Sequence, residues 1–378
     1  MVIGYDAKRA LYNSTGLGNY SRTLIAGVAD CRQFGNSLHL YSPGKGRDEL
    51  RAQVEGLPGT ALSYPGTRAG RLLPALWRSR LVVGDMLRRG VEVYHGLSGE
   101  LPSGLRKAGI DGVVTVHDLI FMIFPQYYKA ADRAIYRRKF RHACREARRI
   151  IAISKRTAED IVRLGGVDPG KISVVYQDCH PSFKDPAGDK AKAGAKARYG
   201  LHGRYILSVG TVEERKNIAL AVRALPQLPR DVELVAVGRR TPYAEKVEKE
   251  AAALGVGGRF RILEGVPLAD LPAVYQQAAA FVYPSRYEGF GIPIVEAAHS
   301  GLPIVACTGS CLEEAGGEGG YYVGPDDVPG MAEMLSRALD SPENPGRIAL
   351  GWLNASRFDN HLAALNTIYE YHRAARLA

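Results

Sequence analysis

Short β-branched runs alternate with longer helical stretches along almost the whole chain, and this alternation restricts the fold most strongly. It predicts parallel strands that are covered by helices on both faces. In the first half we expect strands at 2–5, 38–41, 91–95, 112–116, 149–153 and 172–175. In the second half we expect strands at 205–209, 232–237, 260–263, 280–283, 303–306 and 320–323. The pattern therefore predicts an α/β fold of two doubly wound domains.

A linker is expected between these domains. The segment from Asp185 to Lys196 is rich in Ala, Gly and Lys and lacks large apolar side chains, so we place the linker at 184–200. The domains are then 1–183 and 201–357. A length of 378 residues also favours two hydrophobic cores over one.

The composition is that of a soluble globular protein, with 46% hydrophobic and 24% charged residues. The five cysteines are scattered and form no Cys-x-x-Cys pair, which argues against a disulfide framework and a zinc site and favours a reducing compartment. The chain starts on a strand-like run and contains no stretch of eighteen uncharged apolar residues. We therefore expect a cytoplasmic protein that does not span a membrane.

Two basic clusters contribute to a net charge of +11, which indicates an anionic partner. The first, at 68–89, mixes arginines with leucines and valines and resembles an amphipathic helix that lies on anionic lipid, with Trp77 at the boundary. A helix that packs on the core and exposes a basic face is the alternative. The second cluster lies at 133–149. Neither contains a nucleic-acid-binding motif, so no nucleic-acid partner is expected.

One segment sets two carboxylates, Glu288 and Glu296, on either side of the glycine turn Gly289-Phe290-Gly291. Pro293 suits the first position of a helix and Gly301 suits its end, so Glu296 is expected in the first helical turn. A helix N-terminus attracts phosphate, and carboxylates accept hydrogen bonds from hydroxyl groups. The segment therefore predicts a site for a nucleotide sugar, which carries a diphosphate between two sets of hydroxyls.

A basic pair follows the predicted strand at 205–209. Arg215 and Lys216 precede a helix, where positive charge opposes the helix dipole, so a bound anion explains the pair better than a bare surface does. These two cations can neutralise the charge that builds on a leaving diphosphate. The chain contains no Asp-x-Asp motif, so no metal site is expected.

Two loops of the first domain are further candidates. Gly16 and Gly18 form a glycine-rich turn after the first strand, before a helix expected from about Tyr20, and suit close approach of a phosphate to backbone N–H groups. His117 follows the strand at 112–116, where ligands of parallel sheets bind. Asp118 beside it either orients the imidazole or caps the next segment.

The segment Glu288-x7-Glu296 around Gly-Phe-Gly, after a strand that ends in Phe281-Val282-Tyr283-Pro284, resembles the retaining glycosyltransferases of family 4. The phrase Gly-Thr-Val-Glu-x-Arg-Lys-Asn at 210–217 resembles their mannosyltransferase-like branch, although Thr211 stands where many relatives have arginine. The resemblance implies the GT-B fold, in which two Rossmann-like domains face each other across a cleft. It also implies that the last helix, 358–378, crosses back to the first domain.

The resemblance implies a role for each candidate residue. Glu288 is expected to bind sugar hydroxyls, Glu296 the ribose, and Arg215 and Lys216 the diphosphate. Val266 is expected beside the base, and His117 beside the donor sugar. The turn at Gly16 and Gly18 corresponds to the glycine loop of the family. Glu313 replaces a proline that is common in the loop after the glycine turn.

These observations predict a metal-independent, retaining hexosyltransferase in cell-surface glycan synthesis, peripheral at the inner face of the cytoplasmic membrane. The expected donor is a nucleotide-diphosphate sugar, with GDP-mannose favoured over a UDP-sugar, and the expected acceptor is lipid-linked or a polysaccharide. Two alternatives stay open. One is a sugar-nucleotide 2-epimerase of the same architecture, and the other is a non-catalytic basic protein that binds membranes or nucleic acid.

Overall fold

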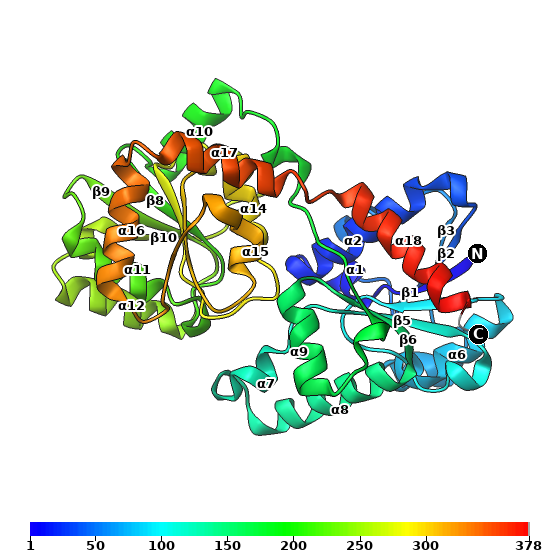
Figure 1. Cartoon of the computed structure of the whole chain (residues 1–378). Helices are drawn as coiled ribbons and strands as arrows, with labels where there is room; N and C mark the ends of the chain where they lie inside the picture. Colours follow the sequence, from blue (N-terminus) through cyan, green and yellow to red (C-terminus); the bar gives the residue numbers. More distant parts are fainter. Residues whose placement is uncertain (377–378) are drawn as a thin grey trace. The chain divides into compact units, whose positions relative to one another are not determined.

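The computed structural model describes residues 1–376, and these residues form two compact units, each built on its own sheet (Figure 1). Unit 1 contains Met1–Gln177 together with the C-terminal residues from Asp359, and unit 2 contains Asp178–Phe358. Residues 377 and 378 of the predicted last helix lie outside the described residues. Each unit is an α/β domain of the Rossmann-like type.

All strands of the unit 1 sheet pair in parallel, in the order β3-β2-β1-β4-β5-β6-β7. Their bounds are β1 Val2–Asp6, β2 Ser37–Tyr41, β3 Thr60–Ser63, β4 Val93–Gly96, β5 Asp111–Val116, β6 Ala147–Ala152 and β7 Ile172–Val174. The strand order reverses between β1 and β4. At such a reversal the loops that follow the two adjacent strands run in opposite directions. Ligands of open α/β sheets bind in the crevice between these loops, at the carboxyl ends of the strands.

The unit 2 sheet is also parallel, in the order β10-β9-β8-β11-β12-β13. Its strands are β8 Arg204–Val209, β9 Val232–Val237, β10 Phe260–Leu263, β11 Ala280–Tyr283, β12 Ile304–Cys307 and β13 Tyr321–Val323. Here the order reverses between β8 and β11. The loops that carry the predicted basic pair and the predicted glycine turn follow these two strands.

Helices cover both faces of the unit 1 sheet (Figure 1). The first face is covered by α1 Lys8–Tyr12, α2 Gly16–Asp30 and α18 Asn360–Arg376, and the second by α6 Val82–Arg88, α8 Ala130–Glu146 and α9 Lys155–Gly165. Short helices complete the unit: α3 Asp48–Arg51, α4 Arg68–Leu72, α5 Pro74–Leu76 and α7 Ile120–Ile123. The adjacent strand residues Val113 and Val114 belong to the two different cores, as the alternation of side chains along a strand requires.

Unit 2 contains eight α-helices among the described residues. They are α10 Asp189–Tyr199, α11 Ile218–Ala224, α12 Pro242–Ala253, α13 Leu271–Tyr275, α14 Ile292–His299, α15 Leu312–Gly316, α16 Val328–Asp340 and α17 Asn344–Ala355. Helices α11, α12 and α16 pack one core against β8, β9 and β12. The helix that follows the glycine turn, α14, contacts α15 and α17.

All twelve predicted strands occur, with ends shifted by no more than a few residues, and β3 is the one that the sequence analysis missed. Its four residues, Thr-Ala-Leu-Ser, lie at the edge of the sheet, and only Ser63 is fully buried. Of these four residues only Thr60 is β-branched and none is aromatic, so the segment lacks the residue types that are enriched in strands.

The predicted linker at 184–200 is largely helical. Helix α10 occupies Asp189–Tyr199 and buries Ala195, and it contacts α13. The amide of Gln276 donates to the carbonyl of Asp185 at 2.9 Å, and its oxygen accepts from the N–H of Ala187 at 2.8 Å. The Ala- and Lys-rich composition suits a helix as well as a linker, because both residues have high helix propensity. The chain passes between the units at Gln177–Asp178 and again at Phe358–Asp359.

Helix α18 belongs to unit 1, and a buried ion pair holds it there. The carboxylate of Glu370 accepts from the guanidinium of Arg149 on β6 at 2.7 Å, and the two side chains are 4% and 2% exposed. Arg149 also donates to Ser173 and to the carbonyl of Gly170. Glu370 also pairs with Arg373 at 3.1 Å, whereas the other acceptors of Arg149 are neutral, so removal of Glu370 leaves an unpaired cation in the interior.

The basic segment 68–89 is a series of short helices. Helices α4, α5 and α6 are interrupted by a π-helical turn at Trp77–Leu81. Trp77 is buried, and its indole N–H donates to Asp85 at 2.7 Å, so the expectation of Trp77 at a lipid boundary is wrong. The indole fills the core instead, because its N–H finds a carboxylate partner there. Within residues 1–376, no helix has the length and apolar character needed to cross a bilayer.

We predict that Glu370→Ala lowers the stability of the protein by about 3 to 5 kcal/mol, the usual cost of breaking a buried ion pair on one side. Glu333→Ala is the control, because Glu333 is an exposed helical glutamate. Thermal and urea unfolding of both variants measure the difference. Equal stability of the two variants would show that the Arg149–Glu370 pair does not hold α18.

Candidate active site

The predicted basic pair and the first predicted carboxylate meet in unit 2. Arg215 and Lys216 lie in a 3₁₀ turn, Glu214–Lys216, after β8, and Glu288 lies in the loop after β11. The Glu288 carboxylate is 3.0 Å from the Arg215 Nη1 atom and 2.6 Å from the Lys216 Nζ atom. These loops are neighbours because β8 and β11 are paired in parallel, so that their carboxyl ends share one edge of the sheet.

The charges of this cluster stabilise one another. Burial by itself raises the pKa of the Glu288 carboxyl, but Lys216 and Arg215 outweigh burial and lower that pKa to about 2. Burial likewise lowers the pKa of the Lys216 ammonium, and the charge of Glu288 reverses this and raises it above its usual value. All three groups are therefore ionised at neutral pH.

Further contacts fix the orientation of the two cations. Lys216 donates to the hydroxyl of Tyr283 at 2.5 Å, and its Nζ atom lies 4.8 Å from the centre of that ring. Arg215 donates to the carbonyl of Tyr287 at 2.7 Å and to the carboxylate of Glu213 at 2.7 Å. Glu288 and the basic pair were expected to make separate contacts with the donor, whereas the structure joins them in one cluster of two cations and two carboxylates.

Asn217 connects this turn to α11 in an unusual conformation. Its φ of 55° makes it the one non-glycine residue with positive φ among residues 1–376. The side chain is buried and donates to the carbonyl of Pro325 at 2.8 Å. Asparagine tolerates this region better than most residues, and the bond to Pro325 offsets the backbone cost. Asn217 therefore sets the direction in which the preceding Arg215 and Lys216 project.

Residues outside the glycine turn between the two glutamates hold this turn in place. Gly291 has a φ of 120°, and a Cβ atom there would lie 3.1 Å from Leu312, so glycine is required. The ring of Phe290 is buried and packs edge-on against Phe358, with centroids 5.0 Å apart. The thiol of Cys311 donates to the carbonyls of Glu288 at 3.1 Å and of Phe290 at 2.9 Å. Burial raises the pKa of this thiol, so it keeps the proton that it donates.

Helix α14 starts at Ile292, with Pro293 as its second residue and Gly301 just beyond its end at a φ of 73°. Glu296 is therefore the fifth residue of α14 and lies in its second turn. The prediction that Glu296 lies in the first turn is wrong, because the helix begins at Ile292 and not at Pro293. The Glu296 carboxylate accepts from the hydroxyl of Tyr275 at 2.6 Å. Burial raises the pKa of Glu296 to about 7, and the Tyr275 hydrogen bond opposes this rise.

Val266 lies in the loop after β10, next to Gly265, whose φ is 69°. Its side chain is partly exposed. The loop is held by Glu264, which accepts from the backbone N–H of Arg240 at 2.8 Å. No contact of the described residues assigns a base to this loop, and the role of Val266 stays a prediction.

The glycine-rich turn of unit 1 is already helical. Helix α2 starts at Gly16, earlier than the predicted start near Tyr20. The N–H of Gly18 donates to the carbonyl of Thr15 at 2.9 Å, and a Cβ atom at Gly18 would collide with the carbonyl of Asn13. Gly18 is therefore required by packing of the chain itself. Gly16 has open space above its Cα atom, as close approach of a ligand requires.

His117 is fixed in one tautomer by its contacts. Its Nε2 atom lies 2.9 Å from the carbonyl of Leu97, which only accepts, so Nε2 carries the proton and Nδ1 is an acceptor. Tyr20 packs edge-on against the imidazole at 4.6 Å. Burial lowers the pKa of His117 to about 4, so the ring is neutral at neutral pH. Asp118 accepts from the N–H of Ile120 at 3.1 Å, which is the capping role among its two predicted roles.

A buried chain of hydrogen bonds supports this part of unit 1. Tyr20 bonds to Thr115 at 2.9 Å, Thr115 to His95 at 2.8 Å, His95 to Tyr371 at 2.8 Å, and Tyr371 to Tyr5 at 2.9 Å. Burial lowers the pKa of His95 to about 3, so the chain contains no net charge. It links α2, β5, β4, α18 and β1, and thereby holds the element that packs against His117.

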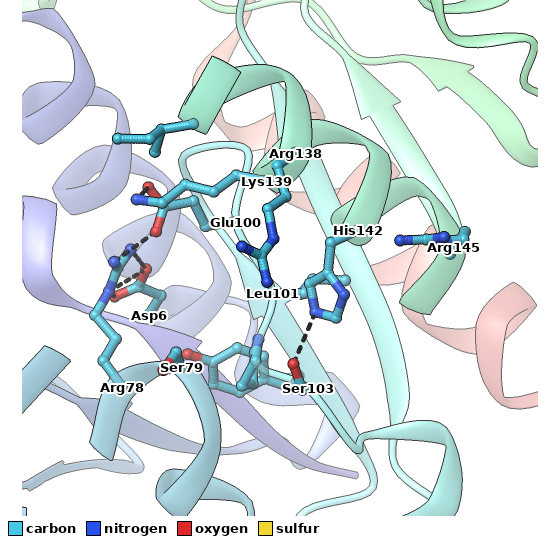
Figure 2. A pocket seen from close by; sticks show the side chains of 13 residues that line it. Asp6, Arg78, Ser79, Glu100, Leu101, Ser103, Arg138, Lys139, His142 and Arg145 are labelled. Atoms are coloured by element: carbon cyan, nitrogen blue, oxygen red, sulfur yellow. Dashed lines mark hydrogen bonds and ion pairs between the residues drawn. The ribbon is translucent and has the colours of Figure 1, made fainter. Parts of the chain in front are cut away.

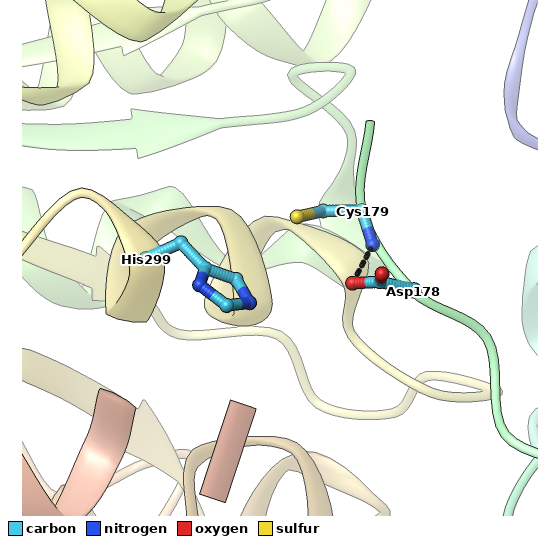
Figure 3. Close-up of side chains that lie close together, drawn as sticks. All are labelled: Asp178, Cys179 and His299. Atoms are coloured by element: carbon cyan, nitrogen blue, oxygen red, sulfur yellow. Dashed lines mark hydrogen bonds between the residues drawn. The ribbon is translucent and has the colours of Figure 1, made fainter. Parts of the chain in front are cut away.

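Asp178, Cys179 and His299 bring three potential metal ligands within 4.8 Å of one another in unit 2 (Figure 3). The carboxylate of Asp178 is already engaged, since it accepts from the N–H of Cys179 at 2.7 Å and pairs with the ammonium of Lys184 at 2.5 Å. A divalent cation at this position would be repelled by Lys184. The three side chains place the first residues of unit 2 beside the last residue of α14.

The structure thus divides the predicted site residues between the two units. His117, Gly16 and Gly18 belong to unit 1, and Arg215, Lys216, Val266, Glu288, the turn at Gly289 to Gly291 and Glu296 belong to unit 2. Four residues that position this site were not predicted: Asn217, Tyr275, Tyr283 and Cys311. Only Asn217 had a local signal, because asparagine is enriched among non-glycine residues with positive φ. The other three act across distances that sequence spacing does not reveal.

Two family models match the chain. The model for glycosyl transferases group 1 matches residues 194–349, and the model for glycosyltransferase family 4 matches residues 15–177. The first match lies within unit 2, and the second lies within unit 1.

Relatives match over the full length. The O-antigen chain mannosyltransferase B of Escherichia coli is 30% identical, and the match covers 98% of this chain and 99% of that protein. The sucrose-phosphate synthase of Thermosynechococcus elongatus has a similar structure, with a TM-score of 0.77, 21% identity and full coverage of both chains. HepE of Anabaena, solved with UDP and glucose, has a TM-score of 0.74 at 17% identity and 98% coverage of each chain. The chain therefore belongs to glycosyltransferase family 4 and is a hexosyltransferase with the GT-B fold.

Proposed function

We propose that the protein transfers a hexose, with mannose favoured, from a nucleotide-diphosphate sugar to a lipid-linked or polysaccharide acceptor in cell-surface glycan synthesis, with retention of anomeric configuration. The observation that carries this proposal is the cluster of Arg215, Lys216 and Glu288 beside the glycine turn. The full-length similarity to a mannosyltransferase supports mannose, and hence GDP-mannose over a UDP-sugar as donor.

Lys216 and Arg215 are proposed to hold the diphosphate. Their positions are fixed by Tyr283, Tyr287 and Glu213 before a donor arrives. Cations that are already oriented stabilise a leaving diphosphate without a reorganisation cost at the moment of bond cleavage. An ammonium has three donors and a guanidinium has five, so both groups keep donors for phosphate oxygens.

Glu288 is proposed to accept hydrogen bonds from sugar hydroxyls. Its pKa of about 2 keeps it ionised, so it is not a general acid at neutral pH. Two ion pairs also weaken it as a nucleophile, because its negative charge is shared with Lys216 and Arg215. We therefore favour substitution on one face of the sugar, in which an oxygen of the departing phosphate takes the proton of the acceptor hydroxyl. The neutral His117, with Nδ1 as an acceptor, is proposed to orient a sugar hydroxyl.

Glu296 is proposed to bind the ribose diol, and Val266 to lie beside the base. The Tyr275 hydroxyl fixes one oxygen of the Glu296 carboxyl. The reaction is proposed to need no metal ion, because Arg215 and Lys216 supply the positive charge that a metal would otherwise provide.

The segment 68–89 is proposed to contact an anionic membrane surface from the cytoplasmic side. Leu72 and Leu73 are 80% and 54% exposed, and Leu76 is 42% exposed. Arg68 and Arg71 lie on the same short helix as Leu72. Exposed leucines beside arginines fit the boundary between acyl chains and anionic headgroups.

The donor is tested by calorimetric titration of the protein with GDP, UDP, ADP and their sugar conjugates, in buffer with EDTA. We expect one nucleotide to bind, and Lys216→Ala to weaken it by about 10- to 100-fold, as loss of a charged hydrogen bond does. Lys246→Ala is the control, because Lys246 is an exposed lysine of α12. Equal affinity of the two variants, or binding that appears only when EDTA is replaced by a divalent metal ion, would contradict the proposed donor site.

The pKa of Glu296 predicts how donor affinity depends on pH. Below about pH 7 the carboxyl is protonated and loses acceptor capacity for the ribose diol, so affinity for the nucleotide should fall as pH decreases from 8 to 6. Tyr275→Phe removes a hydrogen bond that lowers this pKa, so the transition should move to higher pH. Glu296→Gln should bind weakly at every pH. A wild-type affinity that is constant from pH 6 to 8 would contradict the role of Glu296.

Membrane contact is measured by co-sedimentation with phosphatidylglycerol vesicles. Leu72→Ser/Leu73→Ser should bind roughly tenfold more weakly than wild type, because apolar side chains no longer enter the interface. Leu350→Ser/Leu353→Ser is the control, since these leucines of α17 are 45% and 60% exposed. Equal effects of the two pairs would contradict a specific role of segment 68–89.

A further inference from the structure

Helix α8 carries an unusual row of positive charge. Arg133, Arg137, Arg141 and Arg145 recur at every fourth residue, and Arg138 lies beside them. Residues at this spacing lie on one face of a helix, where like charges repel and destabilise the helix by a few tenths of a kcal/mol per pair. An anion that lies against such a row relieves this repulsion.

The protein itself supplies no such anion. The side chains of Arg133, Arg137, Arg138, Arg141 and Arg145 make no ion pair and no hydrogen bond with any of residues 1–376. The neighbouring Lys139, in contrast, pairs with Glu100 at 3.0 Å. We refer to the five unpaired arginines as the α8 arginine row.

Two hollows lie along this row, and Arg138 and Arg145 line both. The first, of about 410 Å³, lies between α8 and the start of the loop after β4. Figure 2 shows Arg138 extending from α8 toward its middle, and His142 bonded to Ser103 at one side. The second hollow, of about 630 Å³, is lined by all five arginines and by the apolar side chains of Phe121, Met122 and Pro125.

The carboxylates of the first hollow do not neutralise the arginine row. Asp6 and Glu100 both pair with Arg78, and Glu100 also pairs with Lys139 (Figure 2). The charge of these two carboxylates is therefore balanced without Arg138 or Arg145. Asp6 ends β1 and Glu100 follows β4, so this hollow lies at the edge of the unit 1 sheet where ligands of such folds bind.

The first hollow also adjoins the segment with exposed leucines. Arg78 and Ser79, which line it, belong to segment 68–89, and the carbonyl of Ser79 accepts from the N–H of Ser103 at 2.8 Å. A ligand with an anionic head would meet arginines in this hollow, and the exposed Leu72, Leu73 and Leu76 lie a few residues before Arg78 in the same segment. Guanidinium groups bind phosphate oxygens with two parallel hydrogen bonds, and several arginines suit more than one phosphate.

We propose that the α8 arginine row binds the diphosphate of a lipid-linked acceptor, with Arg138 and Arg145 as its principal contacts. This proposal rests on the proposed function, and it names the chemical class of the acceptor. In the bound acceptor, the lipid chain extends from the diphosphate toward segment 68–89, and the glycan extends toward the carboxyl ends of β1 and β4.

The test uses the full-length protein and farnesyl diphosphate in detergent micelles, measured by calorimetry without nucleotide. Wild type should bind, and Arg138→Ala/Arg145→Ala should weaken binding by about 100-fold, roughly tenfold for each lost charged contact. Arg138→Lys/Arg145→Lys keeps the charge but loses the paired hydrogen bonds, so its affinity should lie between the two. Arg32→Ala/Arg230→Ala, at exposed arginines elsewhere, is the charge-matched control and should bind as wild type.

Several outcomes would overturn the proposal. An equal loss in the control pair would show attraction by net charge alone. Equal binding of farnesol would show that the diphosphate is not recognised. Loss of binding to phosphatidylglycerol vesicles, with farnesyl diphosphate binding unchanged, would assign the row to the membrane surface. GDP and UDP titrations of the same variants report on unit 2, so failure of the donor site is distinguished from failure of this one.

Discussion

The Glu288 side chain is 11% exposed, and its carboxylate lies between Arg215 and Lys216; the active-site half of unit 2 depends on this contact. A buried carboxylate is costly without partners, and each of these cations is itself largely buried. The three charges therefore hold one another in place and join the loops after β8 and β11. The glycine turn, braced by Cys311, and the turned backbone at Asn217 fit around this cluster.

The cations of the two proposed sites differ in their partners. In unit 2, Arg215 and Lys216 are paired with carboxylates, and Tyr283 and Tyr287 orient them, as suits groups that must act on a leaving diphosphate without rearrangement. In unit 1 the side chains of the α8 arginine row pair with none of residues 1–376 and line two hollows. Unpaired, exposed arginines cost little while hydrated and gain contacts only when an anion arrives, which suits a binding surface for a large, exchanging substrate.

Much of the fold is predictable because most strands contain β-branched or aromatic residues in short runs, and twelve such runs occur. The strand β3 is not predictable in this way because Thr60 is its one β-branched residue and it has no aromatic residue. The composition of segment 184–200 does not distinguish a linker from a helix, because Ala and Lys suit both, and the packing of α10 against α13 decides between them. Trp77 was placed at a lipid boundary because its partner, Asp85, depends on how short helices bend around the π-helical turn.

By itself, the sequence determined the chemistry of the site: two glutamates about a glycine turn, a basic pair after a strand, and a histidine at the end of another. These are local patterns, and local patterns follow from residue identity and spacing. Only the tertiary structure decided the state of each group. Burial and partners from other loops lower the pKa of Glu288 to about 2 and raise that of Glu296 to about 7, although both are glutamates eight positions apart. The electrostatic free energy of a charged group depends on its distance from other charges and on the exclusion of water. Neither quantity can be predicted from the spacing of residues in the sequence.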